Sequence, residues 1–163
     1  MLTIKLVHVV EEHRDAIAAS AVRRMRKDPA TPVIGALPDS TLSGWGKELA
    51  GSFRLWSDAT EHETLARRFF GFGQERCRQQ LPLAELIRAC HIWRECSVSH
   101  LRDQGFQSTS LDIYMEEEVE YDLAGFFEFA AYQITRGYED VRMQKSLNMI
   151  PHQSKKRFHW RQR

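Results

Sequence analysis

The sequence predicts an all-α domain of about five helices, and three observations carry that prediction. Apolar residues recur every three or four positions in five successive segments, as they do on the buried face of a helix. No segment alternates polar and apolar residues with a period of two, and no Asn-Gly hairpin turn occurs. The chain of 163 residues, 42% hydrophobic and 28% charged, has the length and composition of one globular domain with its own core.

A loop that contains proline separates the first two predicted helices. The first runs from about residue 3 to 27 and ends at Asp28-Pro29, because proline disfavours helical geometry in the residue before it. The second begins at Asp39 or Ser40, since either side chain can cap free backbone N–H groups. The two apolar faces consist of Leu6, Val10, Ile17, Ala21, Met25, Leu42, Trp45, Leu49, Phe53 and Trp56. Three glycines on the second helix indicate close approach by a neighbour; they are Gly44, Gly46 and Gly51.

The third and fourth helices are predicted on either side of a proline break. Thr60 and Glu63 have the spacing of a capping box, which opens a third helix that continues to about Gln80. Pro82 interrupts that helix and fits the first turn of the fourth, which runs from residue 83 to about Gly105.

The fifth helix is the longest one predicted. Residues 108–110 can cap it, and its apolar spacing continues to about Leu147. At 1.5 Å per residue this helix is about 55 Å long, against about 25 to 40 Å for the others. Its C-terminal third is therefore expected to project beyond the bundle, with Gly137 as the weak point of a continuous helix.

Charge is distributed unevenly along the chain. Residues 1–150 hold all 22 acidic residues and 18 of the 23 basic ones, a net charge of −4, whereas residues 151–163 carry +5. We expect residues 1–150 to form the domain and residues 151–163 to be a mobile, solvated tail. An acidic body predicts no nucleic-acid partner.

Location is predicted from what the sequence lacks. No stretch approaches about 18 uninterrupted apolar residues, so no membrane-spanning helix is expected. The N-terminus lacks a signal-peptide cleavage site. Three cysteines without a Cys-x-x-Cys pair favour a reduced, cytoplasmic protein.

Enzyme chemistry has little support in the residue patterns. Inward Glu-x-x-His pairs of a carboxylate di-metal bundle are absent, and His8 with Glu12 or His91 with Glu95 are ordinary four-residue spacings. Neither a nucleophile elbow, a P-loop nor a Gly-x-Gly-x-x-Gly loop occurs. We therefore expect no catalytic residues, no metal site and no cofactor.

Two binding hypotheses stay open. A haem-based gas sensor would use His91 as proximal ligand, beside Cys90 and Trp93. Alternatively the aromatic residues at helical spacing either form the core or line a small-molecule pocket between helices. The candidate ligand or interaction residues are Cys90, His91, Trp93 and Phe127, and the candidate dimer or signalling residues on the last helix are Phe126, Ile134, Tyr138 and Val141.

The stretch from Arg67 to Leu101 carries a family resemblance. An arginine-rich helix reaches a break, Leu-Pro-Leu-x-x-Leu-Ile-x-Ala opens the next helix, and Trp93 follows a turn later. This pattern resembles the RsbRD-type N-terminal sensory domain of the RsbR stressosome co-antagonists, with weaker similarity over residues 8–147. The resemblance implies a bacterial, globin-like domain without haem that acts as a signal-input or protein-interaction module. It implies a protein partner in a signalling complex, a homodimer and no catalytic residues, and a small-molecule ligand is compatible with it.

Overall fold

The computed structural model describes residues 7, 8, 10–103 and 110–149, with side chains from residue 117 onward in the last range. Every regular element in these ranges is helical, which confirms the all-α prediction. The elements are α2 (Arg14–Lys27), η1 (Ile34–Ala36), α3 (Asp39–Trp56), η2 (Ala59–Glu61), α4 (His62–Arg78), α5 (Leu83–Asp103) and α6 (Ser110–Asn148). The predicted tail, residues 151–163, and the predicted caps Ser108 and Thr109 lie outside the described residues.

Two predicted helix starts are wrong in detail. The first helix is not continuous, because a turn at His13 separates the helical residues before it from α2. The third does not begin with a Thr60–Glu63 capping box. Asp58 instead caps the start of the short η2 helix, because its carboxylate accepts hydrogen bonds from the Thr60 backbone N–H at 2.9 Å and hydroxyl at 2.7 Å. Helix α4 follows η2 without a side-chain cap.

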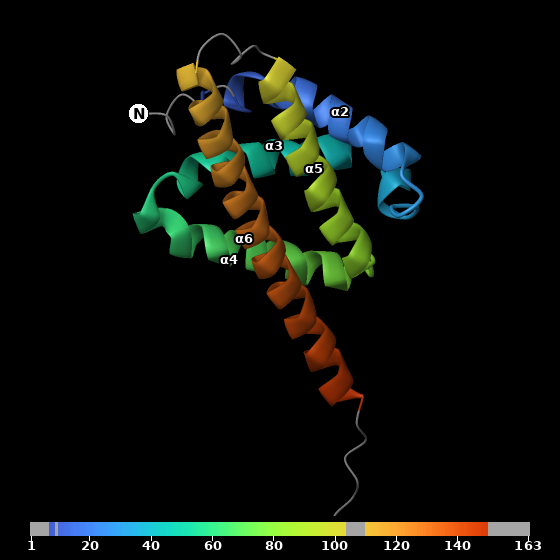
Figure 1. The fold of residues 1–163 in the computed structure, drawn as a ribbon. Coiled ribbons are helices and arrows are strands. Elements are labelled where there is room, and N and C mark those ends of the chain that lie inside the picture. The colour runs from blue at the N-terminus through green and yellow to red at the C-terminus, as the bar shows by residue number, and fades with distance from the viewer. Residues whose placement is uncertain (1–6, 9, 104–109, 150–163) are drawn as a thin grey trace, which may run out of the picture.

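Helix α6 crosses α4 and then continues past the other helices (Figure 1). Its inner face is buried as far as Val141, whereas every residue from 142 to 149 is exposed. At 1.5 Å per residue the 39 residues of α6 span about 58 Å. The prediction of a long last helix whose end projects beyond the bundle is therefore confirmed, and Gly137 does not interrupt it.

The crossing of α4 and α6 brings backbone against backbone. A Cβ added to Gly73 would overlap the carbonyl of Ile134, and a Cβ added to Gly137 would overlap the carbonyl of Phe70. Each helix thus contributes one glycine to a space that no side chain can enter. Because the interior is close-packed, this contact fixes where α6 sits on α4.

Helix α4 ends in a Schellman motif, which sets the position of its last turn. The Leu81 N–H donates to the Arg76 carbonyl at 3.1 Å, and the Gln80 N–H donates to the Cys77 carbonyl at 3.0 Å. Gln80 has φ 60°, the left-handed conformation that this motif requires at that position. The Tyr138 hydroxyl of α6 donates to the Leu81 carbonyl at 2.8 Å, so α6 also holds the turn after α4.

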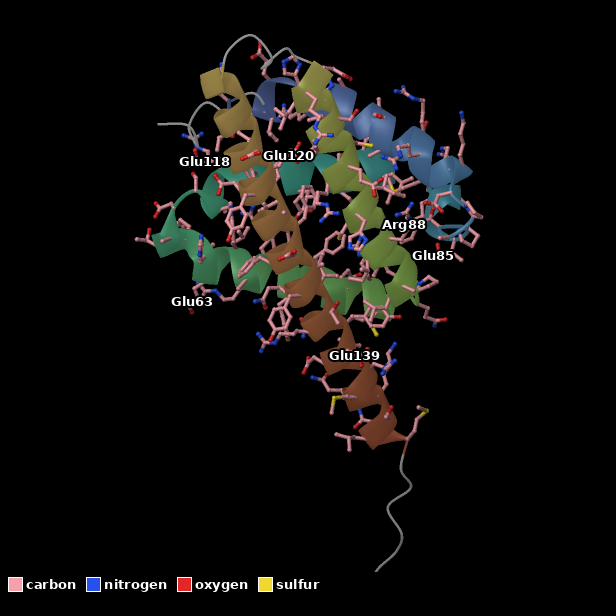
Figure 2. The ribbon with its side chains drawn as sticks, in the orientation of Figure 1. Glu63, Glu85, Arg88, Glu118, Glu120 and Glu139 are labelled. Atoms are coloured by element: carbon pink, nitrogen blue, oxygen red, sulfur yellow. The ribbon has the colours of Figure 1, made fainter. Side chains whose placement is uncertain are left out.

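Charged residues on α5 hold the loop that follows α2. The buried Glu85 carboxylate accepts hydrogen bonds from the backbone N–H groups of Val33 at 2.9 Å and Ile34 at 2.8 Å. One turn later Arg88 donates to the Asp28 carboxylate at 2.7 Å (Figure 2 labels Glu85 and Arg88 on α5). The Arg88 guanidinium and the N–H of Ala30 hold the pKa of the Asp28 carboxyl below its usual range.

Candidate functional site

An apolar pocket of about 50 Å³ lies between α3, α4, α5 and α6. A single water needs only about 10 to 15 Å³ on the same measure, so the pocket has room for a small apolar group. It opens to solvent on one side. Its lining residues are Trp45, Glu48, Leu49, Phe69, Phe72, Leu86, Ala89, Cys90, Trp93 and Ile134.

Two tryptophans shape the walls of the pocket. The Trp93 indole of α5 is buried against α3, where a Cβ added to Gly46 would overlap the indole ring. Trp45 meets the edge of Phe72 with ring centroids 5.5 Å apart. Of the three α3 glycines expected at a close contact, Gly46 is at one, whereas Gly44 and Gly51 face open space.

An anionic residue lines the pocket, and a cationic residue packs against two of its aromatic walls. The Arg76 guanidinium of α4 packs on the faces of Trp45, 4.7 Å from the ring centroid, and Phe72, 4.5 Å from the ring centroid. Glu48 of α3 is an exposed lining residue. Burial lowers the pKa of Arg76, while the carboxylates of Glu75 and Glu48 act in the opposite direction.

Cys90 is a wall residue and not a nucleophile. Its side chain is buried, and burial raises the pKa of the thiol to about 12. A thiolate is the reactive form of cysteine, so this side chain stays protonated and unreactive at neutral pH. Cys77 and Cys96 are also buried.

The structure brings three of the predicted site residues together and separates others from them. Cys90, Trp93 and Ile134 line the pocket. His91 is exposed on α5, and the pocket lining contains no histidine. Phe127 is not a lining residue of this pocket but is buried beside a second, smaller cavity of about 20 Å³, which Trp93 also lines.

The residues expected at a dimer or signalling face of α6 are mostly core residues. Phe126, Ile134 and Val141 are buried within the single chain. The half-buried Tyr138 is hydrogen-bonded to the loop after α4. Any surface through which α6 contacts a partner therefore uses other side chains.

The next feature is the placement of the side chains that could bind a metal ion. Among the described residues, no three His, Cys, Asp or Glu side chains are arranged to hold a metal ion. The exposed His8 lies 3.9 Å from Glu12. The other four-residue pair noted in the sequence is engaged elsewhere, since Glu95 forms ion pairs with Arg24 and Arg88.

Two histidine rings meet where the turn before α2 lies against the end of α5. The ring centroids of His13 and His100 are 4.8 Å apart, and the buried Nε2 of His100 has no hydrogen-bond partner among the residues that the structure describes. Burial, and secondarily the charge of His13, lower the pKa of His100, against a smaller opposing effect of Asp103. Protonation of His100 is therefore disfavoured in the folded state.

This histidine makes stability fall on mild acidification. The unfolded chain takes up the proton at the ordinary pKa of 6.5, and the folded chain only at lower pH. Neutral His100 therefore makes its full contribution to the free energy of unfolding above pH 6.5. That contribution is lost as the pH falls from 6.5 to the lower pKa that His100 has in the folded chain. We expect the urea midpoint to drop between about pH 7.5 and 5.5, and His100→Gln to reduce that drop. An equal drop in His100→Gln would contradict the assignment.

Sequence reasoning missed two polar residues of the site. Arg76 continues the apolar line of Phe69 and Phe72 on α4, and an arginine within such a line was the available signal. Glu48 gave no signal, because one exposed glutamate on a helix resembles any other.

No known family model, curated protein or solved structure matches this chain. The similarity of residues 67–101 to the RsbRD-type domain therefore stays a prediction. Within the described ranges, no helix has both the length and the hydropathy needed to cross a membrane.

Proposed function

We propose that this protein is a non-catalytic signal-input module that responds to occupancy of the apolar pocket by moving α6. The observation that carries the proposal is the double role of α6. Ile134 forms part of the pocket wall, and the same helix extends as an exposed end over residues 142–148. A bound group that displaces Ile134 therefore acts on a helix whose far end is free to contact another protein.

The packing of α6 supports transmission along the helix. At Gly73 and Gly137 the backbones of α4 and α6 touch, so the helices have no side-chain layer that could absorb a small displacement. Packed cores tend to switch between discrete arrangements and do not deform continuously. A ligand shifts such an equilibrium only to the extent that it binds the two arrangements differently.

An exposed line of apolar residues on α6 supports a role in protein interaction. Tyr121, Tyr132 and Met143 are exposed and lie eleven residues apart, so they fall on one face of the helix after every third turn. Leu147 extends this face at the projecting end. The proposed assembly is a two-fold dimer formed through this face, since paired copies are the commonest oligomer.

Sedimentation velocity tests the dimer directly. We expect the wild-type chain, 19.0 kDa, to sediment as a dimer at micromolar concentration. Met143→Glu with Leu147→Glu should shift the protein to monomer while the helical content stays unchanged, because both side chains are exposed in the single chain. Arg142→Glu, at an exposed neighbouring position, serves as the matched control. A wild-type protein that sediments only as monomer would remove the dimer from the proposal.

A haem-based gas sensor is the competing function, and an absorption spectrum distinguishes it from the proposed one. The proposal predicts no Soret band after haem is added to the purified protein. A Soret band that disappears in His91→Ala would replace the proposed function with gas sensing at His91.

A further inference from the structure

Arg76 packs on two aromatic rings and has no anionic partner among the described residues, in contrast to several other arginines of the fold. Arg24 is paired with Glu95, Arg26 with Asp39, and Arg88 with Asp28. Arg76 forms no ion pair with any described residue, and its buried Nε has no hydrogen-bond partner. A buried donor without an acceptor is costly, so this guanidinium is suited to accept an anion from outside the chain.

The aromatic rings hold Arg76 beside the pocket. Its guanidinium lies 4.7 Å from the Trp45 ring centroid and 4.5 Å from that of Phe72, and both rings are part of the pocket lining. Beyond them the lining is apolar and consists of Leu49, Phe69, Leu86, Ala89, Cys90, Trp93 and Ile134. Arg76 is not itself a lining residue but lies against two of the walls, and an unpaired cation next to a small apolar space matches a molecule with one anionic end and one apolar end.

The nearby Glu48 restricts the charge of that molecule. The carboxylates of Glu75 and Glu48 both act electrostatically on Arg76, but neither forms an ion pair with it. An anion at Arg76 is therefore repelled by Glu48, and the repulsion grows with the charge of the anion. A monoanion is favoured over a dianion such as a phosphate ester, and the planar guanidinium fork suits a carboxylate.

We propose that the pocket binds a small monocarboxylic acid, with its apolar group between Trp93 and Ile134 and its carboxylate on Arg76. The inference rests on the proposed function, because it names the class of ligand that would occupy the same pocket. Ligand contact with Ile134 on α6 would then be the event that the projecting end reports.

Benzoate is a suitable probe, and the indole N–H signals of Trp45 and Trp93 in a ¹H–¹⁵N spectrum report on the pocket. We expect millimolar benzoate to shift both signals more than that of Trp56, which is not a lining residue. Benzamide, the neutral isostere, and phenylphosphonate, a dianion, should bind more weakly than benzoate. Absence of any shift at the two pocket tryptophans would overturn the proposal.

Substitutions at Arg76 and at Glu48 are expected to change the affinity for benzoate in opposite directions. Arg76→Gln should weaken benzoate binding about tenfold or more and leave benzamide unaffected, because a charge-assisted bidentate contact is lost. The benzoate affinity of Arg76→Lys should lie between those of wild type and Arg76→Gln. The lysine variant thus provides a second measurement if Arg76→Gln does not fold. Glu48→Gln should strengthen benzoate binding. Weaker benzoate binding in Glu48→Gln, or unchanged binding in Arg76→Gln, would overturn the assignment of a carboxylate to Arg76.

The matched control is Arg67→Gln, an exposed arginine on the same helix that should bind benzoate like wild type. The ligand class and the proposed function can fail independently of each other, and the two failures can be told apart. If benzoate does not bind but filling the pocket by Ala89→Leu still moves α6, the ligand class is wrong and the module stands. If Ala89→Leu leaves α6 in place, the proposed function fails whether or not benzoate binds.

Discussion

Gly73→Ala and Gly137→Ala are each expected to destabilise the protein by about 3 kcal/mol, at the upper end of the usual cost of overpacking. The added methyl group would meet the Ile134 carbonyl in the first variant and the Phe70 carbonyl in the second. Because these are backbone atoms of a regular helix, no rotamer change can relieve the overlap, and α6 must move away from α4. Urea unfolding followed by tryptophan fluorescence measures the change.

Gly71→Ala provides the matched control for this pair. Gly71 lies on α4 between Phe70 and Phe72, and an added Cβ there meets nothing within 4 Å. Alanine is the better helix former, so Gly71→Ala should stabilise the protein by about 0.5 to 1 kcal/mol. If all three variants had similar unfolding midpoints, backbone contact at the crossing would be contradicted.

Glu85→Ala is expected to cost about 3 kcal/mol, since two backbone donors lose a charged acceptor at once. The Val33 and Ile34 N–H groups both point at this carboxylate, and Ile34 is fully buried, so water cannot readily replace the glutamate. Glu85→Gln keeps an acceptor oxygen and should cost less. Chemical denaturation at neutral pH gives both values.

The control for Glu85 is Glu63→Ala, near the start of α4. Glu63 is exposed and forms a surface ion pair with Arg67 at 3.7 Å, so its loss should change stability by less than about 0.5 kcal/mol. Equal effects at Glu85 and Glu63 would show that the hydrogen bonds to the loop contribute nothing beyond helix propensity.

The helices could be predicted because their signals are local. Apolar spacing and Pro82 placed α3 to α6 within a few residues of their observed bounds. The break at His13 was missed because the apolar line continues on both sides of it. The wrong cap at Thr60 has a similar origin, since Asp58 is an equally good capping residue two positions earlier.

The site could be predicted only in part, because periodicity assigns a residue to a face without saying what covers that face. Cys90 and Trp93 were placed correctly near a pocket, yet His91 between them is exposed. Phe126 and Val141 were expected at an interface and are instead covered by the chain itself. The position of Arg76 is set by two aromatic rings, one of which belongs to another helix, so spacing along α4 alone could not predict it.

Movement of α6 on pocket occupancy is the central claim, and a distance between two spin labels tests it most directly. One nitroxide replaces Lys145 at the exposed end of α6, away from the proposed dimer face, and the other replaces the exposed Arg23 on α2. The native cysteines are buried, which favours labelling of the two introduced sites. The distance distribution is measured in the otherwise wild-type protein and in a protein that also carries Ala89→Leu, whose larger side chain fills the pocket.

We expect Ala89→Leu to shift the mean distance between the labels by about 1 to 2 Å, the size of typical helix shifts. Gly44→Ala, which adds a methyl group to α3 where nothing lies within 4 Å, should leave the distribution unchanged. If the distributions of wild type and Ala89→Leu superimpose, although the changed unfolding midpoint shows that the leucine has entered the core, then pocket occupancy does not move α6 and the proposed function is contradicted.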